Sequence, residues 1–569
     1  MLKAYDNFVK LAMKEPVATS GEFLRVKKNV SKILQLPVPT NADLREAYEK
    51  LVAGKKIKRN PAFEKILISK KIRTRSGVAV VAVLTKPYPC PGKCLYCPSE
   101  AKMPKSYLKN EPAVMRAISV KFSPYKQVQK RLHALELNGH KTDKIELIVM
   151  GGTFSYFPKT YQNWFITECF RAVNEYGKKI KSPFLCHSRE GGNPVCKLKD
   201  ARLDSRLRGN DINCAVPKSI IKNLKKDLLT EQKKNETAKR RIIGLTLETR
   251  PDYISEKEIL NFRTLGCTRV ELGVQSVFDD VLKKNNRGHN VAETIRATKL
   301  LKNAGFKINY HIMPGLYGSD ALKDYQMFKT LFSSPDFQPD MLKIYPTVVL
   351  RDSALYSAWK KGKYQALDDK QFEKFILRVK KNLIPPYVRI ARLVRDVPAE
   401  SIIAGPLVSN LRQMIAEKSQ CLCIRCREVG GDFSPNEGIV LNRIDYDASD
   451  GKEIFLEYAT KDTKKLFALL RLRINPLELE NRKTTVPALK NSAIIREVHT
   501  YGTMTQIDKK NSKSPQHIGL GKKLIAEAQK IAKQEFGLQK IAIISGVGAR
   551  EYYRKLGYRL KDSYMVKCI

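Results

Sequence analysis

The chain has 569 residues, and its 105 lysines and arginines outnumber its 57 aspartates and glutamates, which gives a formal net charge of +48. Hydrophobic residues make up 43% and charged residues 28%, a balance that fits several globular domains and excludes wholesale disorder and fibrous proteins. Apolar runs such as 78–84 fall far short of the roughly 20 residues of a membrane span, so we expect a cytoplasmic protein without a membrane partner. The surplus positive charge predicts a polyanionic partner, with nucleic acid as the leading candidate.

Residues 1–75 have the pattern of amphipathic helices that end in a basic tail. The segment Leu51–Arg75 holds nine basic residues against the single acid Glu64. We therefore expect a basic helical segment whose surface contacts phosphate groups.

From residue 76 to residue 395, apolar runs alternate with helical segments. The runs are VAVVAVLT, IELIVMGGT, IIGLTLETRPD, RVELGVQS, KINYHIMPGL and MLKIYPTVV. Continuous apolar strands separated by helices are typical of a parallel sheet. The fold class is therefore α/β, with a full or partial β/α barrel whose chemistry is carried by the loops after the strands.

The alternation fails at about residues 185–214, which lack hydrophobic periodicity and contain two similar polar clusters. We interpret this segment as a surface insertion, because a long loop without structure is tolerated in a barrel only at its surface. Cys186, His187, Cys196 and Cys214 are therefore not candidates for a functional site.

Cys90, Cys94 and Cys97 follow the first apolar strand with the spacing C-x3-C-x2-C. Three thiolates can hold three irons of a 4Fe-4S cluster and leave the fourth iron open to another ligand. An open iron of this kind binds S-adenosylmethionine (SAM) in radical SAM enzymes, and the spacing resembles theirs. The alternative is a structural zinc site or a set of inert buried thiols.

Polar residues also follow the next strands. Gly151 and Gly152 offer backbone groups for the methionyl end of SAM, and Glu248 and Gln275 lie where they could hold ribose hydroxyls. The alternative for each is an ordinary polar position at a barrel rim. These four residues are our candidates for SAM binding.

A second cysteine group, Cys421, Cys423 and Cys426, lies in a linker over residues 396–435. Zinc is the preferred ligand, although a closed tetrahedral site needs a fourth donor that the spacing does not identify. A second iron–sulfur cluster and three free thiols remain open as alternatives.

Residues 436–569 read as a second α/β domain with the order strand, glycine turn, helix, strand and short helix. The turn Gln516, His517, Ile518, Gly519, Leu520 and Gly521 matches the Q/R-x-x-G-x-G/A loop of GNAT acetyltransferases. Glycines in such a turn let backbone N–H groups at a helix N-terminus approach a pyrophosphate. The sequence thus predicts an acetyl-CoA site in a GNAT domain.

In combination, these motifs resemble the family formed by the catalytic subunit of Elongator and the stand-alone tRNA uridine(34) acetyltransferases. The resemblance runs from about residue 75 to the C-terminus, outside the insertion, and rests on the segments NEPAVMRAI, HKTDKIELIVMGGTFSYFP, LTLETRPD, RVELGVQS, MPGLYG, RDVPAESIIAG, SNLRQ, CREVG, IIREVHTYG, QHIGLGKKL and ISGVGAREYYRKLGYRL. It implies that radical cleavage of SAM activates the methyl group of acetyl-CoA, which is joined to C5 of the wobble uridine. Hydrolysis of the thioester would then leave 5-carboxymethyluridine.

The resemblance also implies roles for particular residues. Cys90, Cys94 and Cys97 would hold the cluster, with a shorter first spacing than in eukaryotic members. The expected acetyl-CoA contacts are Lys144, Glu497, Val498, His499, Thr500, the turn 516–521 and Tyr552, among which Lys144 and Tyr552 are the candidate catalytic residues. The basic N-terminal segment and Arg395 would face the tRNA anticodon stem-loop, and an electron donor would reduce the cluster; whether accessory subunits exist is not readable from the sequence.

Two other functions are consistent with parts of the sequence. A protein lysine acetyltransferase with a structural cluster would need neither SAM nor a reductant, but 48 surplus positive charges would repel most basic peptides. A non-catalytic tRNA-binding scaffold would have no need of an open-iron cysteine motif.

Overall fold

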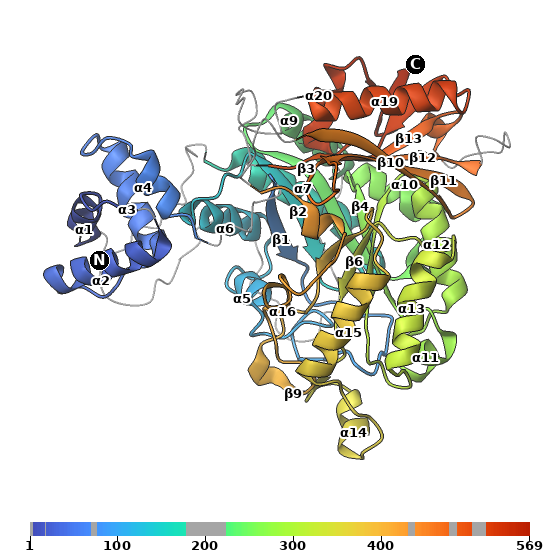
Figure 1. Cartoon of the computed structure of the whole chain (residues 1–569), viewed down its shortest axis with the longest axis horizontal. Helices are drawn as coiled ribbons and strands as arrows, with labels where there is room; N and C mark the ends of the chain where they lie inside the picture. The colour runs from blue at the N-terminus through green and yellow to red at the C-terminus, as the bar shows by residue number, and fades with distance from the viewer. Residues whose placement is uncertain are drawn as a thin grey trace.

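The computed structural model describes residues 4–17, 19–69, 77–177, 224–430, 438–476, 486–502 and 519–569. The segment that we interpret as an insertion, with its three cysteines, lies outside these ranges. Figure 1 shows a small helical lobe at the N-terminus, a central sheet with helices around it, and a C-terminal layer of strands and helices (Figure 1).

The described residues of the N-terminal lobe form four helices, in line with the helical pattern predicted for residues 1–75: α1 (Ala4–Ala12), α2 (Ser20–Leu34), α3 (Asn41–Ala53) and α4 (Pro61–Ile66). Capping boxes start α2 at Thr19 and α3 at Thr40, where each hydroxyl accepts a backbone N–H three residues on. The lobe has its own core, which includes the edge-to-face rings of Phe23 and Phe63. The end of the predicted basic tail, residues 70–75, is outside the described ranges.

The central sheet is parallel throughout and has the order β1-β2-β3-β4-β5-β6-β8. Its strands are β1 (Ala79–Leu84), β2 (Lys144–Met150), β3 (Arg241–Thr249), β4 (Arg269–Gln275), β5 (Lys307–Ile312), β6 (Met341–Ile344) and β8 (Arg389–Arg392). Every residue of β4 is buried, as expected for a central strand that helices cover. The predicted partial barrel is confirmed as a curled half-barrel.

Helices connect and cover these strands: α5 (Pro112–Ile118), α6 (Pro124–Leu137), α7 (Lys159–Glu175), α9 (Leu224–Thr237), α10 (Glu256–Leu265), α11 (Asp279–Lys284), α12 (Val291–Asn303), α13 (Ala321–Ser333) and α15 (Asp369–Asn382). The predicted run 341–349 is not one strand, because Pro346 interrupts it and Val349–Leu350 forms β7, which pairs with β9 (Ile402–Ala404) in a separate ribbon. The short helices α14 (Leu355–Lys360), α16 (Leu411–Met414) and α17 (Ile424–Arg427) complete this region.

The C-terminal sheet has the order β10-β11-β12-β13-β14-β16-β15, in which β13 and β14 pair in parallel and the other neighbours are antiparallel. Its strands are β10 (Ile439–Ala448), β11 (Gly451–Thr460), β12 (Leu466–Ile474), β13 (Ala493–Thr500), β14 (Lys540–Ile543), β15 (Arg559–Lys561) and β16 (Tyr564–Cys568). Helix α19 (Leu520–Gln534) buries one apolar face, and α20 (Arg550–Arg554) follows β14. Strand β13, helix α19, strand β14 and helix α20 follow one another in the predicted order, and most of the predicted glycine turn lies outside the described ranges.

The C-terminal sheet packs against the amino ends of the parallel strands. Arg496 of β13 is fully buried and donates to Asp340, just before β6, at 3.0 Å and to Glu453 of β11 at 2.8 Å. At the start of β3, a Cβ added to Gly546 would collide with the backbone of Ile243. The two halves therefore share a close and highly charged interface.

Within the described part of the chain, no helix combines the length and the apolar character that crossing a membrane requires.

Candidate active site

Cys90, Cys94 and Cys97 lie in the long loop after β1, at the carboxyl edge of the parallel sheet, and all three are half-buried. Two contacts hold this loop against the segment after α11. The backbone N–H of Leu95 donates to the carbonyl of Asn285 at 3.1 Å, and Arg287 Nη1 donates to the sulfur of Cys94 at 3.4 Å. Burial raises the pKa of the Cys97 thiol to about 11. A site that keeps this sulfur as a thiolate therefore needs a compensating cation.

Two buried arginines supply positive charge next to the cysteine loop. Arg250 makes a bidentate ion pair with Asp252 at 2.9 and 2.8 Å, while its Nη1 is buried without a hydrogen-bond partner. Arg287 Nε is likewise buried without a partner, and a Cβ added to Gly92 of the cysteine loop would meet Arg250 Nη1. A buried polar nitrogen without a hydrogen-bond partner destabilises the fold unless a ligand supplies the missing partner. Three thiols beside two guanidinium groups, each with one nitrogen that has no hydrogen-bond partner among the described residues, fit an iron–sulfur cluster and a polar co-substrate.

Neighbouring strand ends carry further signs of a binding site. Gly151 adopts φ +130°, and a Cβ there would collide with Thr85, whose hydroxyl is buried without a partner. Gln275 ends β4 with φ +72°, a conformation that costs about 1–3 kcal/mol for a residue other than glycine. Its side-chain Oε1 is also buried and unpartnered. The structure thus brings the predicted Gly151 and Gln275 to the edge that carries the cysteine loop, and Gly152 follows directly with φ +94°.

Glu248 belongs to a polar network inside the half-barrel. It accepts a hydrogen bond from Tyr107 Oη at 3.0 Å, and its other oxygen lies 3.6 Å from His311 Nδ1. His311 Nε2 in turn lies 3.0 Å from Glu271, which is also paired with Lys343. The nearby Lys343 cation and the His311 hydrogen bond hold the pKa of Glu271 well below its ordinary value, despite burial. The interior of the half-barrel therefore holds fixed charges next to the edge of the sheet that carries the cysteine loop.

Lys144 lies at the opposite end of the sheet. It begins β2, next to Arg241 of β3, and burial lowers its pKa. Arg241 in turn faces Gly548 of the C-terminal half, where an added Cβ would collide with it. The structure therefore separates Lys144 from the cysteine loop and places it at the edge that faces the C-terminal half.

Four predicted acetyl-CoA contacts converge in the C-terminal half. A Cβ added to Gly521 would lie 3.5 Å from Thr500 Oγ1, 3.6 Å from Tyr552 Oη and 3.8 Å from Val498 Cγ1. Gly519 adopts φ +79° at the start of α19, and no side chain of the described residues caps this helix. Backbone N–H groups at the start of α19 and the partly exposed Tyr552 phenol therefore face one area, beside the end of β13.

The other predicted acetyl-CoA residues are placed differently. The Glu497 carboxylate pairs with Lys307 at 3.0 Å and with Arg471 at 3.0 Å, so this side chain joins the two halves. The His499 ring lies tilted beside that of Tyr501, with 4.4 Å between centroids and 45° between planes. Leu520 is buried in the C-terminal core, and Gln516, His517 and Ile518 lie outside the described ranges.

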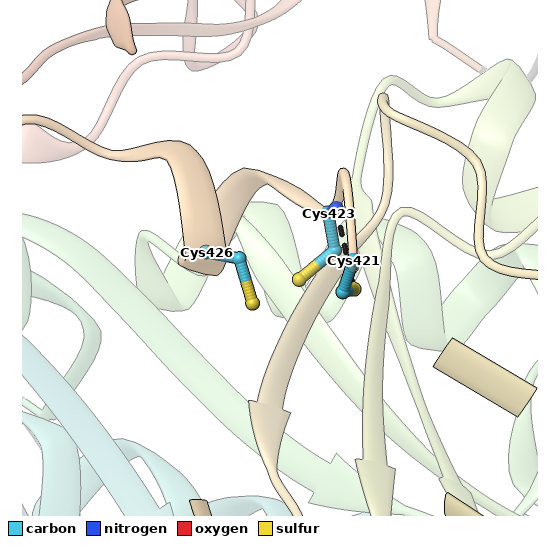
Figure 2. A group of neighbouring side chains, drawn as sticks. All are labelled: Cys421, Cys423 and Cys426. Carbon is cyan, nitrogen blue, oxygen red and sulfur yellow. Dashed lines mark hydrogen bonds between the residues drawn. The ribbon is translucent and has the colours of Figure 1, made fainter. Parts of the chain in front are cut away.

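Cys421, Cys423 and Cys426 bring their sulfurs within 4.8 Å of one another, and no other described group of three cysteine, histidine or acidic residues does so. Figure 2 shows the Cys423 thiol pointing toward that of Cys426, which α17 positions (Figure 2). Hydrogen bonds from the neighbouring thiols hold the pKa of Cys423 well below its ordinary value. This geometry suits a single metal ion, in contrast to the wider arrangement of the first cysteine group. A cavity of about 720 Å³ lies beside it, lined by residues that include Arg412 and Arg425.

Sequence reasoning missed several of these residues. Arg287 and His311 appear in no motif spacing, and their contacts join positions far apart in the chain, such as Arg287 and Cys94. Arg250 lies in the segment LTLETRPD, directly after the predicted strand, so its position could have marked it.

Comparison with known proteins agrees with this geometry. Residues 218–328 match the model of the radical SAM superfamily, and residues 339–420 match that of the Radical_SAM C-terminal domain. The family implies a 4Fe-4S cluster and SAM as cofactors. The matched ranges begin after the cysteine loop, so the evidence for that loop is its own spacing and geometry.

Similar sequences cover most of the chain. A tRNA uridine(34) acetyltransferase of Dehalococcoides mccartyi is 43% identical over 88% of this chain and 99% of the relative. The human Elongator complex protein 3 is 35% identical over 90% of this chain and 88% of the relative. The solved Elp3 of Methanocaldococcus infernus with an N-terminal deletion covers 87% of this chain and 100% of its own, at 38% identity and a TM-score of 0.67. The chain therefore belongs to the radical SAM family that includes Elongator complex protein 3 and the tRNA uridine(34) acetyltransferases.

Proposed function

We propose that this protein modifies the wobble uridine of tRNA, using SAM-dependent radical chemistry and acetyl-CoA to form 5-carboxymethyluridine. The observation that carries the proposal is the cysteine loop at the carboxyl edge of the half-barrel, with the unpartnered atoms of Arg250 and Arg287 beside it. Membership of a family whose relatives are named for tRNA uridine(34) supports the choice of substrate.

Within this proposal, Cys90, Cys94 and Cys97 hold a 4Fe-4S cluster that, when bound with SAM, supplies a carbon-centred radical. Arg287 donates to the Cys94 sulfur and stabilises its negative charge. The backbone at Gly151 and Gly152 and the side chains of Glu248 and Gln275 orient SAM at the strand ends. Of the groups at this edge, Gln275 Oε1, Arg250 Nη1 and Arg287 Nε have no hydrogen-bond partner among the described residues.

The C-terminal half is proposed as a GNAT domain that binds acetyl-CoA. Its single parallel strand pair, β13 with β14, and the glycine turn before α19 support this assignment. The pyrophosphate would bind the N–H groups at the start of α19, and the Tyr552 phenol would face the thioester. Burial raises the pKa of Tyr552, so this group stays a hydrogen-bond donor at neutral pH.

The proposed partners are the tRNA anticodon stem-loop and an electron donor. The basic N-terminal lobe and Arg395 would contact the RNA. Arg395 donates to Ser106 at 3.3 Å and stacks over Tyr107, whose phenol donates to Glu248, so it lies next to the proposed SAM site. A zinc ion at Cys421, Cys423 and Cys426 is proposed as a structural element.

The experiment combines anaerobically reconstituted protein with SAM, acetyl-CoA, dithionite and tRNA, and analyses the digested nucleosides by mass spectrometry. We expect 5-carboxymethyluridine with the wild type and none with Cys94→Ala. Acetyl-lysine formed without SAM or reductant would favour a protein acetyltransferase with a structural cluster. Binding of tRNA without a modified uridine would contradict the radical chemistry.

A further inference from the structure

An aromatic pair protrudes from the half-barrel on the short helix α14. Tyr356 and Trp359 are one helical turn apart, and their rings stack with 5.8 Å between centroids and 28° between planes. Both side chains are partly exposed, while Leu355 and Tyr364 beneath them are buried. Two stacked rings that are anchored from below but still reach solvent form a rigid platform.

The platform is attached to the cysteine loop. Leu355 N–H donates to the carbonyl of Leu95 at 2.8 Å, and Ser99 N–H donates to the carbonyl of Asp352 at 3.2 Å. Tyr96, which lies between Cys94 and Cys97, packs against the same small core. The aromatic pair therefore has a fixed position relative to the proposed cluster, and α14 lies at the end of the half-barrel away from the C-terminal layer (Figure 1).

The surroundings of the pair are basic. The segment 351–364 contains Arg351, Lys360, Lys361 and Lys363 against the single acid Asp352, and all four cations are exposed. Exposed Lys93 lies in the cysteine loop itself. A stacking surface surrounded by cations has the chemistry that single-stranded nucleic acids bind, because every base has a π-face and every linkage a phosphate.

We infer that Tyr356 and Trp359 form a stacking platform for an unpaired nucleotide of the substrate RNA, next to the cysteine loop. The inference rests on the proposed function and specifies where the unpaired loop is held. Bases in an RNA helix are already stacked on each other, so only a single-stranded segment can use the platform. The flanking lysines bind its phosphates without regard to sequence.

The two tryptophans of the chain, Trp164 and Trp359, permit a direct test. The Trp164→Phe protein, full-length and reconstituted, carries Trp359 as its single tryptophan. It is titrated with an anticodon stem-loop RNA and, separately, with a blunt RNA duplex of the same stem. RNA binding is followed by fluorescence anisotropy of a label on the RNA, and stacking is followed by quenching of tryptophan emission.

We expect quenching with the stem-loop and not with the duplex. In protein that retains Trp164, Trp359→Ala should weaken stem-loop binding about 5- to 150-fold, the range that corresponds to the loss of one stacked base. Trp359→Phe should retain most of the affinity, and because its ring is kept it also controls for loss of folding.

Stem-loop binding without quenching, or equal quenching by the duplex, would overturn the platform while leaving the proposed function intact. Absence of stem-loop binding by the wild type would overturn both. Unchanged affinity in a folded Trp359→Ala protein would also overturn the platform.

Discussion

Arg287 combines burial, positive charge and a hydrogen bond to a candidate cluster ligand. A cation next to a cluster favours its reduced, more negative state, so we predict that Arg287→Lys lowers the reduction potential and Arg287→Met lowers it further. A differential interaction of about 1.4 kcal/mol corresponds to about 59 mV for a one-electron couple. Spectroscopic redox titration of the reconstituted protein measures the effect.

Arg296 offers a matched control for this prediction. It is an exposed arginine on α12 whose Nη1 donates to the carbonyl of Ile254 at 2.7 Å and not to a cysteine. Arg296→Lys should leave the potential unchanged. An equal shift in both lysine variants would contradict a specific role for Arg287.

The second cysteine group makes a separate prediction about metal content. We expect roughly one zinc per chain in addition to iron, and loss of that zinc in Cys426→Ser, because one of three thiolate donors is removed. Cys426 is the exposed member of the group, so its replacement leaves the packing of Cys421 and Cys423 in place. Elemental analysis of purified protein measures both metals, and Cys568→Ser, at another exposed cysteine, serves as the control.

Zinc retained in Cys426→Ser, or iron in its place in the wild type, would contradict the zinc assignment.

At the residue scale, spacing in the sequence predicted both cysteine groups and the glycine positions, because these motifs are local. It could not predict the side-chain partners. Glu497, for example, lies on a strand expected to offer backbone groups to acetyl-CoA, and the pairing of its carboxylate with Lys307 across the interface was not expected. Such pairs depend on the packing of two halves, for which a single sequence carries no spacing signal.

Among the elements, helix α19 allows a test of the proposed acetyl-CoA site that leaves the fold unchanged. A methyl group at Gly521 makes only ordinary contacts of 3.5–3.8 Å, and alanine suits a helix better than glycine, so Gly521→Ala should not destabilise the protein. The added methyl group would nevertheless occupy the space beside the N–H groups proposed to hold the pyrophosphate. We predict that acetyl-CoA binds at least about 10-fold more weakly than to the wild type, which corresponds to the loss of one or two hydrogen bonds to a charged group.

Isothermal titration calorimetry measures the affinity, and urea unfolding checks stability. Gly537→Ala, at a glycine beyond the end of α19 with open space around it, is the control; its positive φ makes some strain expected but no loss of acetyl-CoA affinity. Full affinity in Gly521→Ala would argue against the glycine turn as the binding site.

Strands with continuous apolar runs were the elements best predicted from sequence, since β2, β4 and β5 lie within a residue or two of the expected starts. Short or mixed strands such as β8 and β15 were missed, because their burial patterns show neither a continuous run nor an alternation. The predicted run at 341–349 extended too far because proline cannot donate to the ladder.

For the whole molecule, the buried charged side chains between the halves determine whether the chain unfolds as one unit. Arg496 contacts Asp340 and Glu453. Although burial raises the pKa of both carboxyl groups, the neighbouring cations, Arg496 first among them, hold it below its ordinary value. Arg496→Met would leave the two carboxylates without their main cation, which typically costs about 3–5 kcal/mol. Urea unfolding followed by circular dichroism should show this loss and a separation into two transitions.

Arg443→Met is the control, because the Arg443 pairs with Asp445 and Glu535 are solvent-exposed and are worth little. A single unchanged transition in Arg496→Met would show that other contacts suffice to couple the halves.

Because the C-terminal half is attached to the amino ends of the strands, the acetyl group has a long distance to cover in the proposed enzyme. The cysteine loop lies at the carboxyl ends, so the two proposed cofactor sites would stand about one strand apart, and the seven residues of β2 span about 23 Å. That span is too long for direct contact between the bound cofactors. The thioester end of acetyl-CoA would have to be delivered along the interior of the half-barrel, past Glu271 and His311. The interior of the half-barrel would then be the path of the acyl group, and its fixed charges would determine which acyl groups can pass.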